Sequence, residues 1–277
     1  MTSTIISIQS QVVHGHVGNS AAVFPMQAMG HVVAAVPTAL LSNHPHYPTM
    51  HGQVLGADLL RGLLLGVEER GLMDSAGAVV SGYLGSVDNG EVVADFVARA
   101  RQRNPRLLYV CDPVMGDDDL GIFVQSGLIE LFRQRLAPLA SIITPNRYEL
   151  ELLAQRMVRS AQDVAEAMAA LAARGTGAGM VTGCVLDDTM PGTVETLAWT
   201  PDRLSRSAIA RLPIRPCGTG DLITALMLGR LLRGQDLHQA SHRATREILA
   251  VLERTRKQGA AEMCLAGFPF GIDTEPA

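Results

Sequence analysis

Residues 216–229, PCGTGDLITALMLG, place a carboxylate at the start of an apolar stretch that is typical of a buried helix. Gly218, Thr219 and Gly220 directly precede this carboxylate, Asp221. Glycine lets the backbone approach a ligand closely, and a helix N-terminus offers unpaired N–H groups to an anion. A phosphoryl group in transfer would suit such an anion hole, and Asp221 could accept a proton from an attacking hydroxyl. The simpler alternative is a helix N-terminal acid, worth about 0.3–1 kcal/mol through the dipole.

Other polar side chains follow the runs that we expect to be strands, and in open α/β sheets ligands bind beyond the carboxyl ends of the strands. Asp112, Asp117 and Glu149 are suited to Mg²⁺, which prefers a few carboxylates together with water and phosphate. The alternative for Asp112 is a turn acid that binds backbone, and for Asp118 and Asp119 a solvated loop. The remaining strand-end candidates are Gln9, Ser10, Tyr83, Asn146 and Thr182.

These side chains need a scaffold in which strands and helices alternate. We expect strands at 4–8, 31–37, 77–85, 107–111, 141–145, 179–185, 193–199 and 204–212, and helices at 21–30, 57–70, 88–103, 126–137, 146–154, 161–175, 219–233 and 237–257. Asn19 or Ser20 could cap the first helix, and Ser160 with Asp163 forms a capping-box pattern. The alternation predicts an α/β fold with a mainly parallel sheet covered on both faces. No linker divides residues 1–277, so we expect a single domain, with a loosely ordered tail after about residue 258.

Composition narrows the functional classes. The formal net charge of −4 gives no basic field, so we expect neither nucleic acid nor a membrane as partner. The four cysteines, Cys111, Cys184, Cys217 and Cys264, form no CxxC pair and are read as small buried residues of a reducing compartment. We see no signal peptide and no apolar run of about 20 residues, so we expect a cytoplasmic protein.

Several motifs carry a resemblance to known kinases. GTGD at 218–221 and NRYE at 146–149 resemble the anion-hole and NxxE motifs of the ribokinase-like kinases. Within that superfamily, residues 8–30, SNHPHY (42–47), SGYLGS (81–86), YVCDPVMGD (109–117) and IITPNRYELELL (142–153) resemble the pyridoxal kinases. The matching segments occur in the family order and span residues 8 to 230. Residues 186–212 and the C-terminal tail carry little of this signal.

The resemblance implies a three-layer α/β/α ribokinase-like fold and ATP-dependent phosphorylation of the 5′-hydroxymethyl group of pyridoxal, with pyridoxine and pyridoxamine as related substrates, in vitamin B6 salvage. It implies a homodimer and Mg²⁺, and leaves open a monovalent cation. Asp221 would be the base, and Gly218, Thr219 and Gly220 would cradle the γ-phosphate. The segment 116–125 would act as a lid. The resemblance assigns Asp112, Asp117 and Glu149 to the metal, Asp112, Thr144, Asn146, Glu149, Thr182 and Gly183 to ATP, and Ser10, Val17, Leu41, His46, Tyr83 and Cys217 to the vitamer.

Two positions depart from the family pattern at the pyridine-ring end of the site. Leu41 stands where the family usually has an aromatic residue, and Pro45 where it usually has threonine. Loss of the aromatic face is worth about 0.5–1.5 kcal/mol beyond buried area, and His46 is a candidate replacement contact. Two alternative functions stay open: a hydroxymethylpyrimidine kinase, and a vitamer-binding protein with little catalysis.

The histidines form two groups, His44, His46 and His51 in one loop and His14 and His16 in another. A zinc site is conceivable. The spacing matches no strong zinc pattern and no cysteine is close in sequence, so structural or substrate-loop roles are the favoured interpretation.

Overall fold

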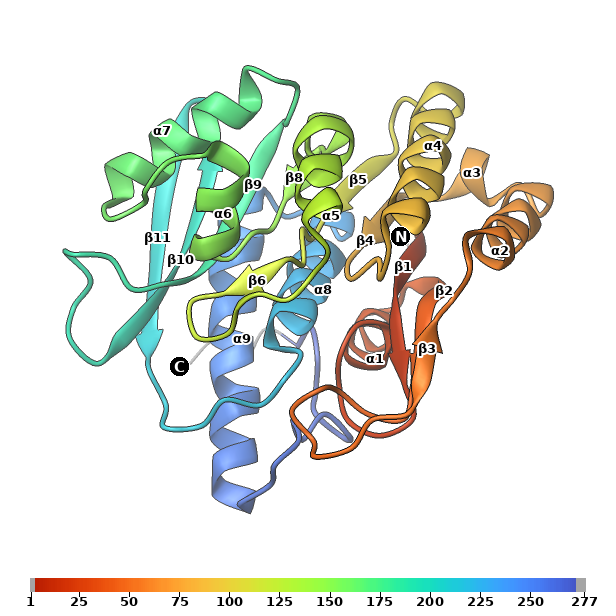
Figure 1. The fold of residues 1–277 in the computed structure, drawn as a ribbon. Helices are drawn as coiled ribbons and strands as arrows, with labels where there is room; N and C mark the ends of the chain where they lie inside the picture. The colour runs from red at the N-terminus through yellow and green to blue at the C-terminus, as the bar shows by residue number, and fades with distance from the viewer. Residues whose placement is uncertain (1–2, 273–277) are drawn as a thin grey trace.

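The computed structural model describes residues 3–272. Within them, nine strands form one sheet in the order β11-β10-β9-β8-β5-β4-β1-β2-β3 (Figure 1). The six strands from β9 to β2 pair in parallel, and β3, β10 and β11 join as antiparallel neighbours at the two edges. The strands are β1 (Thr4–Val12), β2 (Val32–Leu41), β3 (Gly52–Val54), β4 (Ala78–Ser81), β5 (Leu108–Cys111), β8 (Ile142–Ile143), β9 (Ala178–Cys184), β10 (Thr193–Thr200) and β11 (Arg203–Ala210).

Helices cover both faces of this sheet. The buried core divides into two clusters: Ile6 and Ile8 of β1 belong to one and Ile5 to the other, because successive strand side chains point to opposite faces. One face packs against α1 (Asn19–Ala28), α8 (Thr219–Leu232) and α9 (Leu237–Gln258). The other packs against α2 (Ala57–Glu69), α3 (Leu72–Ser75), α4 (Val87–Arg103), α5 (Ser126–Leu131), α6 (Arg147–Ala154) and α7 (Ala161–Ala172).

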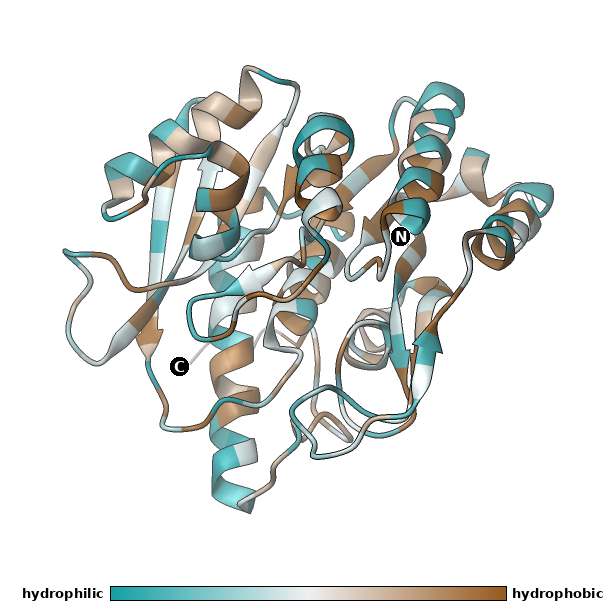
Figure 2. Cartoon of the chain, viewed as in Figure 1, coloured by the Kyte–Doolittle hydropathy of each residue, from teal (hydrophilic) through white to brown (hydrophobic). Residues whose placement is uncertain are grey.

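This arrangement confirms the expected three-layer α/β/α fold. Figure 2 shows apolar residues on the strands and on the inner sides of the helices, with polar residues outside. The capping box of α7 is confirmed, since Ser160 and Asp163 bond each other's backbone N–H. Among residues 3–272, no helix combines the length and apolar character that crossing a membrane requires.

The expected end of the first strand and the expected cap of the first helix are both wrong. β1 continues to Val12 through an irregularity between Gln9 and Gln11, so Gln9 and Ser10 lie inside the strand and not after it. The cap of α1 is Gly18, not Asn19 or Ser20. The Asn19 side chain instead accepts from Ser7 and donates to the Gln9 and Val36 carbonyls, and the Ser20 hydroxyl bonds the Val12 backbone. Both polar side chains hold β1 against α1.

Several short elements were not expected. They are β3, α3 and a hairpin of β6 (Gly116–Asp117) and β7 (Gly121–Ile122) within the segment expected to be a lid. The helix expected at 126–137 is α5 followed by a π-helical turn, Phe132–Leu136, and a 3₁₀ turn, Ala137–Leu139. Pro138 lacks the backbone N–H that an α-helix continuing through this position would need, which is why the helix does not extend further.

The expectation of a loosely ordered tail is wrong for residues 259–272. Met263, Leu265 and Phe270 are buried in the core cluster of α1, α8 and α9. The phenyl ring of Phe270 packs edge-on against that of Phe24, with ring centroids 5.8 Å apart. Residues 273–277 lie outside the described part of the chain. Burial of apolar side chains therefore docks the segment after α9 onto the fold.

Candidate functional site

The N-terminus of α8 is shaped by Gly218. This residue caps the helix in the left-handed region, with φ 80° and ψ 11°. A Cβ added here would lie 1.7 Å from the His16 carbonyl oxygen, so only glycine fits. A Cβ on Gly220 would meet no atom within 4 Å. The first turn of α8 thus packs tightly on its His16 side and is open at Gly220, which leaves its N–H groups accessible to a ligand.

Asp221 lies in the first turn of α8. It is crowded by protein atoms yet keeps part of its surface accessible. Burial raises the pKa of its carboxyl to about 6, and a hydrogen bond with the Gly18 backbone opposes that rise. At neutral pH the group is therefore mainly ionised and only weakly stabilised in that form, which suits a general base.

Two further carboxylates extend this acidic group: Asp112 lies near Asp221, and Glu149 lies near Asp112. Asp112 directly follows β5 and is 5% exposed, and Glu149 in α6 is 4% exposed. Burial and the charges of Glu149 and Asp221 raise the pKa of Asp112 well above its usual range, and a hydrogen bond from Thr144 opposes the rise. Burial raises the pKa of Glu149 to about 8. The three acids come from three separate elements of the fold.

This donor set fits a divalent cation. Buried carboxylates that raise one another's pKa need a positive counter-charge, and Mg²⁺ binds oxygen ligands of this kind. The Glu149 oxygens also accept the backbone N–H groups of Met115 and Asn146, both at 2.9 Å. Asp117 raises the pKa of Glu149 through its charge, but one of its oxygens accepts from the N–H groups of Asp119 and Leu120. Asp112 therefore accepts fewer hydrogen bonds from the protein than Glu149 or Asp117, and its oxygens are the freest to bind a cation.

The residues predicted to bind ATP adjoin this set. Asn146 caps α6 through a capping box with Glu149, and its amide donates to the Gly116 carbonyl at 2.8 Å. Thr182 pairs with Asn146 in a parallel bridge. Gly183 has φ 64° and open space around its Cα. Thr144 receives a hydrogen bond from Thr224 of α8 at 3.0 Å. The structure brings these residues together at the carboxyl ends of β8 and β9.

The residues predicted to contact the vitamer ring lie on β1, β2 and the loops beside them. Ser10 is buried in β1, where a Cβ on Gly18 would lie 2.5 Å from its hydroxyl. Leu41 ends β2, and Tyr83 follows β4 with its carbonyl accepting from Thr38. Val17 adjoins Gly218, with its Cα 3.2 Å from the position of a Gly218 Cβ. These neighbours place Ser10 and Val17 beside the start of α8.

A second group of ring-end residues links distant segments. His46 lies with its Nδ1 3.1 Å from the Cys217 Sγ. Cys217 is half-buried, as is Cys264, whereas Cys111 and Cys184 are buried as expected; all four are free thiols. Glu262 was not expected here from the sequence; its carboxylate accepts from the Tyr47 hydroxyl at 2.8 Å and lies 2.7 Å from the His44 Nε2. No local pattern marks Glu262, because its partners are more than 200 residues away.

The segment expected to be a lid contacts both ends of this region. Asp118 pairs with Arg147 of α6, and Asp119 pairs with Arg215, two residues before Cys217. Both acids are exposed, as expected for a solvated loop, and each also pairs with an arginine. Leu120, Ile122 and Phe123 of the same segment are exposed.

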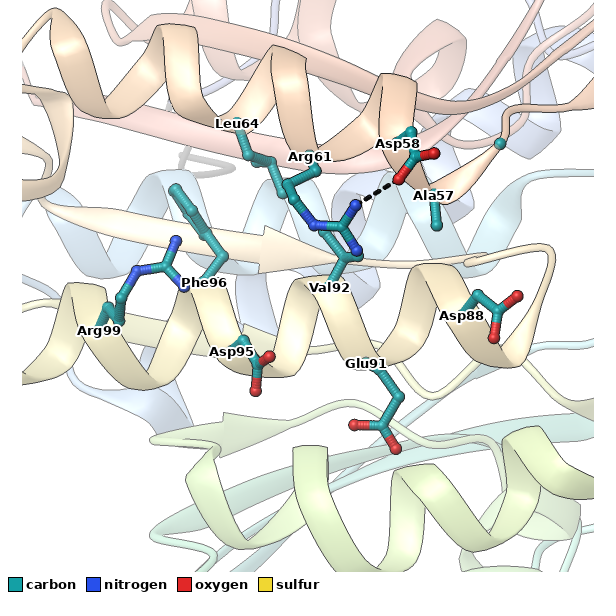
Figure 3. A pocket seen from close by; sticks show the side chains of 11 residues that line it. Ala57, Asp58, Arg61, Leu64, Asp88, Glu91, Val92, Asp95, Phe96 and Arg99 are labelled. Atoms are coloured by element: carbon teal, nitrogen blue, oxygen red, sulfur yellow. Dashed lines mark hydrogen bonds and ion pairs between the residues drawn. The ribbon is translucent and has the colours of Figure 1, made fainter.

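A separate cavity of about 600 Å³ lies between α2 and α4 (Figure 3). Its lining includes the ion pair between Asp58 and Arg61, at 2.5 Å, and the acids Asp88, Glu91 and Asp95. None of the predicted site residues lines it. Asp58, Asp88 and Asp95 of this cavity are exposed.

Comparison with known proteins agrees with this description. The family model described as phosphomethylpyrimidine kinase matches residues 73–265. The pyridoxal kinase PdxY of Rubrobacter xylanophilus is 43% identical over 98% of this chain and 94% of its own length. The pyridoxine/pyridoxal/pyridoxamine kinase of Bordetella avium is 39% identical over 94% of this chain and 88% of its own.

Solved structures show the same relation. The pyridoxal kinase of Leishmania donovani in complex with ADP and pyridoxamine matches with a TM-score of 0.88 and 26% identity, covering 96% of this chain and 94% of that one. The pyridoxal kinase of Entamoeba histolytica matches with a TM-score of 0.87 and 25% identity, covering 95% and 93%. The fold and these similarities define a kinase of the ribokinase-like fold. Within that class, the chain belongs to the pyridoxal kinase family.

Proposed function

We propose that this protein transfers the γ-phosphate of ATP to the 5′-hydroxymethyl group of pyridoxal, and also of pyridoxine and pyridoxamine, for vitamin B6 salvage. The observation that carries the proposal is Asp221, a carboxylate with a pKa raised to about 6 in the first turn of α8. The relatives support the same substrates: the Leishmania donovani kinase is described with ADP and pyridoxamine, and with ADP and pyridoxine.

In this mechanism, Asp221 accepts the proton of the substrate hydroxyl as its oxygen attacks the γ-phosphorus. The N–H groups at Gly218, Thr219 and Gly220 stabilise the charge that spreads over the equatorial phosphoryl oxygens. Asp112 and Glu149, with Asp117, would hold Mg²⁺, which neutralises charge on the transferring phosphates. The work of the protein is positioning and charge stabilisation, because the phosphoryl transition state needs little covalent help.

The other predicted contacts complete the proposal. Thr144, Asn146, Thr182 and Gly183 would line the nucleotide side, and Ser10, Val17, Leu41, Tyr83, His46 and Cys217 the vitamer side. The segment 116–125 would close over the reacting groups and exclude water. Its ion pair from Asp119 to Arg215 supports a contact with the anion-hole side of the site.

We also propose a homodimer, a single domain over residues 1–277 and a cytoplasmic location. The exposed leucines of α2, Leu59, Leu63 and Leu65, are candidates for burial between subunits. The four free thiols agree with a reducing compartment. Light scattering on the purified chain tests the dimer, and activity with and without K⁺ tests a monovalent-cation requirement.

A substrate-panel assay tests the function. The wild type with ATP and Mg²⁺ is expected to phosphorylate pyridoxal with a higher kcat/KM than hydroxymethylpyrimidine. Asp221→Asn should bind pyridoxal but turn it over poorly, whereas Asp58→Asn, an exposed acid in the first turn of α2, should behave as wild type. Faster turnover of hydroxymethylpyrimidine would favour the first alternative. Tight binding of pyridoxal phosphate without turnover would favour the second, a binding protein.

A further inference from the structure

Three metal-ligating side chains meet beside the anion hole. His44 and His46 come from the loop between β2 and β3, and Cys217 directly precedes Gly218. One ligand atom from each of the three lies within 4.8 Å of the other two. His46 and Cys217 are 171 residues apart in sequence, with Nδ1 and Sγ separated by 3.1 Å. The fold therefore supplies the cysteine that is missing near the histidines in sequence.

His44 has a buried ring nitrogen with no partner. The residue is 6% exposed, and its Nε2 lies 2.7 Å from Oε1 of Glu262. Its Nδ1 is buried and has no hydrogen-bond partner among the described residues. Since a carboxylate accepts the hydrogen bond at Nε2, the neutral ring carries its proton there and presents a lone pair at Nδ1. A buried lone pair without a partner is costly, and a metal ion would satisfy it.

Glu262 is itself held in place. Its Oε1 accepts from the Tyr47 hydroxyl at 2.8 Å, and its Oε2 accepts from the His16 backbone N–H at 3.2 Å. A carboxylate that fixes the tautomer and orientation of a histidine is the usual outer-shell partner of a metal ligand. The contact between Glu262 and His44 matches that arrangement.

We propose that His44, His46 and Cys217 form a binding site for a transition-metal ion of the Zn²⁺ class. Two imidazoles and a thiolate are the donors that Zn²⁺ prefers, and three protein ligands leave a fourth position for water or a small ligand. Metal–ligand bonds of about 2.0–2.3 Å place tetrahedral ligand atoms about 3.3–3.6 Å apart. The ligand atoms now lie within 4.8 Å of one another, so the widest gap would have to close by up to about 1.2 Å. On binding, Cys217 releases its thiol proton to solvent.

This site differs in chemistry from the Mg²⁺ site. The proposed Mg²⁺ donors are all oxygens, whereas the three ligands here are nitrogen and sulfur. A bound ion would hold the loop between β2 and β3 against Cys217, the residue directly before Gly218 of the anion hole. The assignment does not rest on the proposed kinase activity, because metal binding is measured directly.

Cobalt substitution tests the site. The full chain is stripped with a chelator, reduced, and titrated with Co²⁺ in excess Mg²⁺. We expect one equivalent of Co²⁺ to give a thiolate-to-cobalt charge-transfer band, which one equivalent of Zn²⁺ removes by displacement. Zn²⁺ should also raise the melting temperature. A wild-type protein without the band at stoichiometric Co²⁺ would overturn the proposal, whatever the variants do.

Matched variants locate the ligands. Cys217→Ser should lose the charge-transfer band, whereas Cys264→Ser, the other half-buried thiol, should keep it. His46→Ala should weaken binding, but His51→Ala, an exposed histidine of the same loop, should not. Glu262→Gln should lower metal affinity about 10–100-fold. Melting of each metal-free variant confirms that it folds. A band that survives in Cys217→Ser, or disappears equally in Cys264→Ser, contradicts the assignment.

Discussion

The two ends of the candidate site are built differently. At the phosphate end, the groups assigned to the reaction and to the metal stand at the ends of regular elements: Asp112 after β5, Asn146 at the cap of α6 and Asp221 in the first turn of α8. At the ring end, Leu41 closes β2, but Pro45, His46 and Cys217 lie in connecting segments. Their neighbours include Glu262, from the segment after α9.

This difference separates reaction from selectivity. Phosphoryl transfer needs donors held to within a fraction of an ångström, and element ends provide that rigidity. Loops tolerate substitution, so they can change which ring is bound without disturbing the reacting groups. We therefore expect variants at the phosphate end to change kcat strongly, and variants at the ring end to change KM modestly.

The largest expected effect is that of Asp221→Asn. Loss of the base should lower kcat about 10²–10⁴-fold with little change in vitamer binding. The folded-state pKa of Asp221, about 6, lies above its ordinary value of 3.8, so stability falls as the pH rises from 3.8 to about 6 and the full cost remains above that pH. The variant should therefore melt no lower than wild type at pH 7.5. Steady-state kinetics and thermal melting measure both quantities. A near-normal kcat would remove Asp221 from the reaction and blur the contrast between the two ends.

Gly220→Ala should have the next largest effect. An added Cβ meets no protein atom within 4 Å, so folding should be intact, but the methyl would stand where the γ-phosphate must approach. A displacement of about 1 Å in the reacting group can cost about 100-fold in rate. We expect a loss of that order in kcat/KM for ATP at an unchanged melting temperature.

Gly218→Ala is the matched comparison. Its Cβ would collide with the His16 carbonyl oxygen at 1.7 Å, so this variant should melt lower as well as lose activity. Equal melting temperatures for the two variants would contradict the asymmetry of the α8 N-terminus. Normal activity in Gly220→Ala would show that the phosphate does not approach there.

Local patterns were enough to predict much of the phosphate end. Gly218 has a backbone conformation and close contacts that only glycine accommodates, and NRYE at 146–149 encodes the capping box between Asn146 and Glu149. Alternating apolar runs were enough for the layers of the fold. Each of these signals lies within a few residues of the structure that it determines.

The ring end could not be predicted in this way. His44 and Glu262 meet across 218 positions, and Cys217 and His46 across 171. Docking of Met263, Leu265 and Phe270 brings Glu262 there, and no periodic pattern marks so short a segment. The extension of β1 from Ile8 to Val12 was also missed, because the register shift between Gln9 and Gln11 interrupts its alternation.

Lowering the pH should slow phosphoryl transfer without weakening the binding of the vitamer. The base must be deprotonated, and the pKa of Asp221 is about 6, so activity should fall as the pH drops through that value. Below it, kcat/KM should decrease about tenfold per pH unit. Binding of a vitamer, measured by fluorescence over the same range, is the control. An unchanged rate down to pH 5 would show that another group accepts the proton.

The smallest expected effect is that of Leu41→Phe at the ring end. The residue is half-buried at the end of β2, opposite Val12 and Gly52, and an aromatic face there could stack on the pyridine ring. Stacking is worth about 0.5–1.5 kcal/mol, or about 2- to 13-fold in affinity. We expect KM for pyridoxal to fall by that factor at constant kcat. Leu40→Phe is the control, because the Leu40 side chain is exposed and points to the opposite face of β2 from Leu41. If Leu41→Phe changes kcat instead of KM, the two ends of the site are coupled. The ring end would then not determine selectivity independently of the reaction at the phosphate end.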